Sequence, residues 1–147
     1  MARLVKFFGL LVLCGGLGAP TRSDPCVVFL VTPSYPPLAR TARITGTVDL
    51  RVYLRCTGEV EAVDLIGVRS NARPDTGNAW LSETATNNIK AWVFDPAPEG
   101  CVAARQLDVQ YVFKLEGEPA YYPDTRTTLR LPHIVEVVAR PPSTIVD

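Results

Sequence analysis

The chain has 147 residues, of which 47% are apolar and 20% are charged, a composition that suits one small globular domain with tails and excludes two separate cores. Fifteen basic residues balance fifteen acidic residues, so we expect neither a nucleic acid nor an anionic membrane surface as a partner. The sequence contains no glycine-rich phosphate loop and no carboxylate-rich metal loop, and we therefore expect no cofactor, no metal and no small-molecule substrate.

Residues 1–23 are predicted to be a signal peptide. Arg3 and Lys6 precede an apolar stretch, residues 7–17, that is too short to cross a bilayer as a helix. Cys14 leaves a second interpretation open, because Leu-Val-Leu-Cys-Gly partly resembles a lipobox and would make the chain a lipoprotein. Under either interpretation the chain is exported.

Residues 24–34 are interpreted as a lead-in segment to the folded domain. A short helix is expected between Ser34 and Ala42, with the serine as its cap and prolines in its first turn. Apolar and polar residues then alternate from Val48 to Leu54, which predicts the clearest half-buried strand of the chain.

A second strand is expected from Glu59 to about Arg69, after a turn at Gly58. The apolar positions of this strand change parity once, which predicts a bulge near Glu61 or Ala62.

A helix and a third strand are predicted next. Residues 70–78 have the composition of a loop. The apolar residues that follow recur at helical spacing and define one face of a helix, namely Leu81, Ala85, Ile89 and Trp92. Pro96 and Pro98 should end the helix, and alternation from Leu107 to Leu115 predicts the third strand.

The order of these elements predicts an α+β fold, a three-stranded antiparallel or mixed sheet with two helices in the order α-β-β-α-β. The second strand, the helix and the third strand form a crossover, which makes the third strand parallel to the second. If the first strand lies between them, the sheet order is two, one, three, and the third strand is a free edge.

The same topology predicts a disulfide between Cys56 and Cys101. The end of the first strand and the start of the third lie at the same end of the sheet, and an exported protein can form disulfides. Cys26 would then be free or bonded between chains. The cysteine spacing lacks a Cys-x-x-Cys pair, so we expect no zinc site, and we interpret the lone His133 as a hydrogen-bonded surface imidazole.

The residue order resembles the TonB carboxy-terminal domain family over residues 35–115. The resemblance rests on Tyr35-Pro36-Pro37-Leu38-Ala39-Arg40, on Gly46 and Val48, on the turn at Gly58, and on Trp92-Val93-Phe94-Asp95-Pro96. It implies a periplasmic protein-binding module that pairs with a short extended segment of an outer-membrane receptor along the free edge of the third strand.

The predicted partner-binding residues are Tyr35 and, along the third strand, Leu107, Val109, Gln110, Tyr111, Val112 and Phe113. Tyr35 has an equally supported alternative, packing against the sheet, while Trp92 and Phe94 are expected in the core. Arg40 is expected on a solvated face.

The expected function is binding of an outer-membrane receptor, a transport partner or another envelope protein. Because an amino-terminal membrane helix and a long Pro-rich spacer are not evident, energy transduction is not expected to transfer from the family. The alternative is a structural envelope module or lipoprotein. An enzyme is not expected, since Ser82, Asp95 and His133 lack the motif context of a catalytic triad.

Residues 116–147 form a carboxy-terminal extension beyond the family pattern. The run from Ile134 to Ala139 is β-prone and apolar on both faces, so it needs a partner strand. We expect it either to return to the third strand as an extra strand or to pair with a second copy in a swapped homodimer. Either arrangement would mask the recognition edge.

Overall fold

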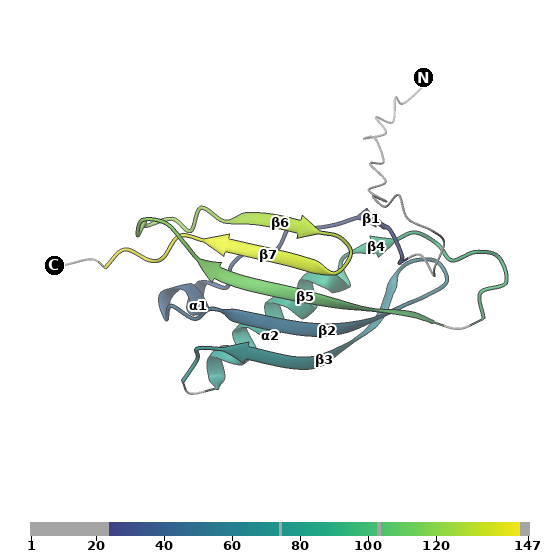
Figure 1. Ribbon diagram of the computed structural model, residues 1–147, viewed down its shortest axis with the longest axis horizontal. Helices are drawn as coiled ribbons and strands as arrows, with labels where there is room; N and C mark the ends of the chain where they lie inside the picture. The colour runs from purple at the N-terminus through teal and green to yellow at the C-terminus, as the bar shows by residue number, and fades with distance from the viewer. Residues whose placement is uncertain (1–23, 74, 103, 145–147) are drawn as a thin grey trace, which may run out of the picture.

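The computed structural model describes residues 24–73, 75–102 and 104–144 (Figure 1). In chain order the elements are β1 (Val27–Phe29), α1 (Pro37–Thr41), β2 (Gly46–Leu54), β3 (Val60–Ser70), α2 (Thr76–Lys90), β4 (Val93–Phe94), β5 (Arg105–Leu115), β6 (Arg126–Arg130) and β7 (Ile134–Ala139). The predicted signal peptide, Cys14 included, lies outside the described residues. Within the described ranges, no helix has the length and apolarity that crossing a membrane requires.

The main sheet has five strands in the order β3-β2-β5-β7-β6, and α2 lies across one of its faces (Figure 1). The α+β class and the order of the first three predicted strands are confirmed. Strands β3 and β5 are both antiparallel to β2 and hence parallel to each other, as the crossover required. The predicted number of three strands is wrong, because β7 and β6 of the extension continue the sheet beyond β5.

Two irregularities interrupt the pairing of β3 with β2. Tyr53 pairs with Ala62 while Leu54 pairs with Val60, so Glu61 is an extra residue where a bulge was predicted. A second shift, which the sequence pattern did not reveal, leaves Ile66 as an extra residue. The long strand β3 is therefore irregular at two points along an outer edge of the sheet.

Both helices begin at residues that differ from the sequence expectation. Helix α1 begins at Pro37 after Pro36, and no side-chain hydrogen bond caps it, so the predicted serine cap is wrong. Helix α2 begins at Thr76, inside the predicted loop. Gly77 is buried there, and a Cβ built on it would overlap the side chain of Ile44, so the missing side chain lets the helix approach the segment before β2.

The core lies between the sheet and the helices. Helix α2 contributes Leu81, Ala85 and Ile89, the face that its spacing predicted, and Trp92 and Phe94 are 1% and 0% exposed. Asn88 joins three parts of the chain, since its Oδ1 accepts from Tyr111 Oη at 2.7 Å and its Nδ2 donates to the Val31 carbonyl at 2.8 Å. The aromatic core residues are thus positioned by polar contacts as well as by burial.

The lead-in segment is part of the fold through a second, two-stranded sheet. Strand β1 pairs antiparallel with β4, and the amide of Cys26 donates to the Asp95 carboxylate at 2.9 Å. Strands of two or three residues have no readable periodicity, which is why the sequence pattern predicted neither β1 nor β4.

The predicted disulfide between Cys56 and Cys101 is present, with 5.9 Å between the two Cα atoms. It joins the turn after β2 to the segment before β5. Cys26 is also disulfide-bonded, so of the two alternatives expected for it, a free thiol and a bond between chains, the free thiol is wrong.

Candidate functional site

Strand β5, the predicted recognition edge, lies inside the sheet (Figure 1). On one side it pairs antiparallel with β2, and on the other it pairs in parallel with β7 over six residue pairs, from Gln110 opposite Ile134 to Leu115 opposite Ala139. The prediction of a free edge is therefore wrong. The prediction that the extension returns to the third strand is confirmed, because an apolar strand and an edge of unpaired amides satisfy each other.

The side of β5 that faces the helices is closed by core packing. Its alternate residues are all buried, namely Leu107, Val109, Tyr111 and Phe113, and so are Val135, Val137 and Ala139 of β7. The ring of Tyr111 stacks with that of Phe113 at a centroid distance of 6.3 Å. These four β5 side chains therefore pack in the core beneath the strand and are not exposed to a partner.

Tyr35 lies in the same core. It is 3% exposed, its hydroxyl donates to the Ile44 carbonyl at 2.5 Å, and its ring meets Phe113 edge-on. Burial raises the pKa of Tyr35 well above its usual value, so it stays a neutral donor. This is the alternative in which Tyr35 packs against the sheet.

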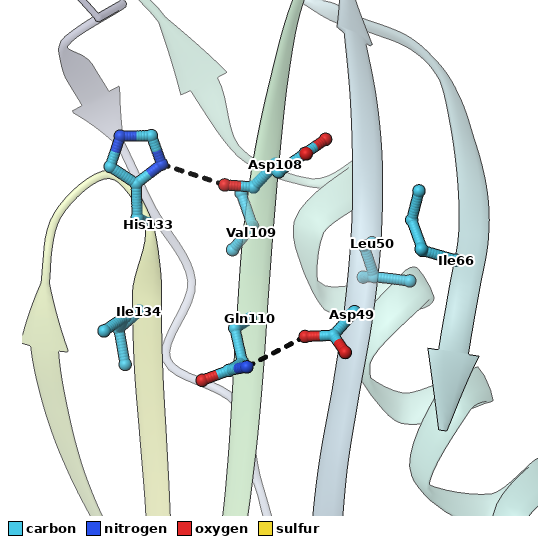
Figure 2. A pocket seen from close by; sticks show the side chains of 8 residues that line it. All are labelled: Asp49, Leu50, Ile66, Asp108, Val109, Gln110, His133 and Ile134. Carbon is cyan, nitrogen blue, oxygen red and sulfur yellow. Dashed lines mark hydrogen bonds between the residues drawn. The ribbon is translucent and has the colours of Figure 1, made fainter. Parts of the chain in front are cut away.

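The opposite side of the sheet, which we call the open face, carries Gln110 and Val112 of β5. Gln110 Nε2 donates to Asp49 Oδ1 at 2.9 Å, as the dashed line in Figure 2 shows. A shallow groove of about 410 Å³ crosses this face from Ile66 on β3 to Ile134 on β7 (Figure 2). Gln110 and Val112 are half-buried, so they are the predicted β5 residues with the most access from outside.

Charged residues on the open face are paired across strands. Arg51 of β2 binds Asp108 of β5 through two contacts, Nε to Oδ1 at 2.8 Å and Nη2 to Oδ2 at 3.2 Å. This hydrogen bonding lowers the pKa of Asp108. Arg51 and Asp108 are directly opposite each other in the pairing of β2 with β5, so their contact stabilises this register.

His133 fastens the start of β7 to its surroundings. Its Nδ1 lies 2.9 Å from the Asp108 carbonyl oxygen, its Nε2 lies 2.7 Å from Asp24 Oδ2, and its own carbonyl accepts from the Gln110 amide at 2.7 Å. Both acceptors require a donating ring nitrogen, so the protonated imidazole fits best. The Asp108 carbonyl, together with the Asp24 carboxylate, raises the pKa of His133. The predicted hydrogen-bonded surface imidazole is confirmed.

The protonation of His133 should make stability depend on pH. Its pKa in the folded chain lies above the usual value of 6.5, so its contribution is complete below about pH 6 and is lost as the pH rises through the folded pKa. Urea unfolding between about pH 6 and pH 9 should show a decline in the wild-type chain that His133→Gln lacks. A decline of the same size in His133→Gln would contradict this assignment.

Arg40 holds the extension against α1, a role that the expectation of a solvated face missed. Its guanidinium donates to four backbone carbonyls of the extension, those of Arg140 at 2.7 Å, Ala120 at 2.5 Å, Tyr121 at 3.3 Å and Pro141 at 3.4 Å. Arg43 makes one such bond, to Pro142 at 3.1 Å. Backbone carbonyls some 80 to 101 residues away leave no sequence pattern, and the only signal was the place of Arg40 in the opening motif.

The three residues of the discarded catalytic triad have separate structural roles. Ser82 Oγ donates to the Ala79 carbonyl, Asp95 accepts from the Cys26 amide, and His133 binds Asp24 and Asp108. Within the described ranges, no group of three or more His, Cys, Asp or Glu side chains is placed to hold a metal ion. The arrangement offers hydrogen bonding and packing.

Comparison with known proteins agrees with the predicted resemblance. The family model described as Gram-negative bacterial TonB protein C-terminal matches residues 31–115. Protein TonB of Vibrio cholerae serotype O1 is 31% identical over 88 residues, which are 59% of this chain and 33% of that protein. The chain thus spans about a third of the length of this relative.

A solved structure was also matched, the solution NMR structure of Pseudomonas aeruginosa TonB CTD. It is 22% identical, covers 69% of this chain and 96% of its own, and has a TM-score of 0.49. The family match itself ends at Leu115, the last residue of β5, so β6 and β7 lie beyond it. Since the family model covers more than half of the sequence, the chain belongs to the family of Gram-negative bacterial TonB protein C-terminal domains.

Proposed function

We propose that the chain is an exported, periplasmic protein-binding module that accepts an extended segment of an outer-membrane receptor or of another envelope protein as an added strand on β5. Domains of this family are protein-interaction domains and not enzymes. Strand addition supplies main-chain hydrogen bonds for affinity and uses side-chain contacts for specificity. The contacts proposed for the partner are the outer amides and carbonyls of β5 with Gln110 and Val112.

The observation that supports the proposal is that β5 already accepts a strand in this manner. Strand β7 pairs with it in parallel, from a segment that lies outside the family match. The chain's own strand therefore occupies the edge, and a partner must replace it. The apparent affinity is the intrinsic affinity multiplied by the fraction of molecules in which β7 has left β5.

The structural-module alternative has an observation in its favour. Val135 and Val137 are both 0% exposed, so displacement of β7 uncovers apolar side chains and costs about 1.5 to 3 kcal/mol for each. If no partner strand compensates for this free-energy cost, β7 stays paired with β5 permanently. The chain would then act only as a structural module of the envelope. The two functions therefore differ in whether β7 exchanges.

Removal of the Arg40 guanidinium, which holds the extension against α1, should strengthen the binding of a separate peptide strand to β5. Arg40→Ala deletes charge-assisted hydrogen bonds to the extension, and the loss of about 1.5 kcal/mol in closed-state stability raises the open fraction about tenfold. The probe is a fluorescein-labelled peptide with the sequence of residues 131–141, and its anisotropy measures the dissociation constant. Arg43→Ala, which removes one bond from the same region, is the matched control and should change binding much less.

A cross-link between the two strands supplies the opposite test. Val112 and Glu136 are paired residues on the open face, so a chain with Val112→Cys and Glu136→Cys can be locked by oxidation. The cross-linked chain should bind no peptide and should retain no envelope protein that the wild-type chain, kept equally oxidised so that its own disulfides stay intact, retains. Equal retention by both chains would exclude β5 as the site, and no retention by either would favour the structural module.

A further inference from the structure

We propose that the partner strand of β5 carries a carboxylate that pairs with Lys114, between two alternate positions restricted to valine-sized side chains. This inference rests on the proposed function and names the chemistry of its partner. Strand β7 is the template, because it is the strand that the β5 edge holds.

The side chains that face the helices limit the size of the partner's residues. Val135 lies opposite Tyr111 and Val137 lies opposite Phe113, and both valines are 0% exposed. Tyr111 and Phe113 are themselves 0% and 1% exposed, and Tyr35 packs edge-on against Phe113 at 5.6 Å. The walls of these two positions are therefore fixed by the core, and a larger side chain would overpack them.

The contacts on the open face determine the charge of the partner residue that takes the place of Glu136. Glu136 lies opposite Val112, and its Oε2 is 3.1 Å from Nζ of Lys114. On β2, the residues opposite Val112 and Phe113 are Thr47 and Gly46, which carry no charge. Displacement of β7 therefore removes the Glu136 carboxylate that pairs with Lys114. A partner strand with a carboxylate at the position of Glu136 restores this ion pair.

This carboxylate is partly shielded from solvent. The Glu136 side chain is 21% exposed, against 45% for Lys114. An ion pair of this kind contributes modestly, and we expect it to change affinity by roughly two- to fivefold. Its effect is on the choice among partner segments more than on the total affinity.

The test compares three peptides on three full-length chains. Two of the peptides have the sequence of residues 131–141, one with glutamate and one with lysine at the position of Glu136. The chains are wild type, Lys114→Glu, and Lys90→Glu as a matched charge control at the exposed end of α2. Because the open fraction of a given chain is the same for both peptides, the ratio of their dissociation constants is independent of how firmly β7 is held.

The wild type and Lys90→Glu should prefer the glutamate peptide by roughly two- to fivefold, and Lys114→Glu should prefer the lysine peptide by a similar factor. A third peptide, with phenylalanine at the position of Val137, should bind at least about fivefold more weakly to all three chains because it overpacks the core. This inference is overturned if the dissociation constants of the glutamate and lysine peptides have a ratio near one in every chain, or if the phenylalanine peptide binds as tightly as those two. In both cases the peptides still bind β5, so the proposed function is retained. If no peptide binds any chain, the proposed function fails with it.

Discussion

Replacing Cys56 and Cys101 together by alanine should lower the free energy of unfolding by roughly 4 kcal/mol in the chain-entropy account of a disulfide that closes a loop of this length. The two cysteines are 45 residues apart, and the loop contains β3, α2 and β4. Without the bond, the unfolded chain regains the conformational freedom of this whole loop, while the folded chain keeps its sheet pairing.

Urea unfolding measures this effect and also tests its origin. If the disulfide acts on the unfolded state, its removal expands that state, so the dependence of the unfolding free energy on urea should become steeper. A loss of packing alone would lower stability with an unchanged slope. A decrease of less than about 1 kcal/mol with an unchanged slope would contradict the loop-closure account.

Gly58→Ala should also be strongly destabilising, with an expected loss of more than about 2 kcal/mol. Gly58 has a φ of 95°, and a Cβ built on it would overlap the carbonyl oxygen of Phe94. The Gly58 carbonyl also accepts from the Phe94 amide at 2.8 Å. The substitution therefore both strains the turn and pushes β4, with its buried Phe94, away from the end of β2.

Gly117→Ala is the matched control for the backbone strain. Gly117 has a φ of 89°, but a Cβ built there would meet no atom within 4 Å. Gly117→Ala should cost only the conformational strain, about 1 to 2 kcal/mol. The difference between the two variants in urea or thermal unfolding isolates the overlap with Phe94, and equal losses would mean that this close approach has no energetic weight.

The sequence predicted those parts of the fold in which a periodic pattern and burial coincide. Alternation from Val48 to Leu54 predicted β2, because every second residue there is buried. Strand β6 escaped prediction since its five residues are polar or charged except Leu129, as suits an outer strand held by backbone pairing to β7. The start of α2 escaped it because a tertiary contact at Gly77 overrides the loop composition.

The candidate site was only partly predictable for a related reason. The apolar run of β7 indicated that this segment needs a partner strand, and the predicted topology left one edge of β5 unpaired. The pairing of β7 with β5 could therefore be predicted from the hydrophobic pattern. The contacts of Arg40 could not be anticipated, because its acceptors are main-chain carbonyls that any residue supplies. The same holds for the bond between His133 and the Asp108 carbonyl.

The two irregular points of β3 also bear on how the protein behaves when many copies are crowded together. Strand β3 is the longer of the two outer strands of the sheet, and extra residues at Glu61 and Ile66 break the even spacing of its outward amides and carbonyls. Strand β6, at the other margin, is five residues long and has an arginine at each end. Neither margin offers the long, flat, regular template on which copies stack into fibres, so both outer strands disfavour edge-to-edge aggregation, and the strand exchange that we propose at β5 would not depend on either of them.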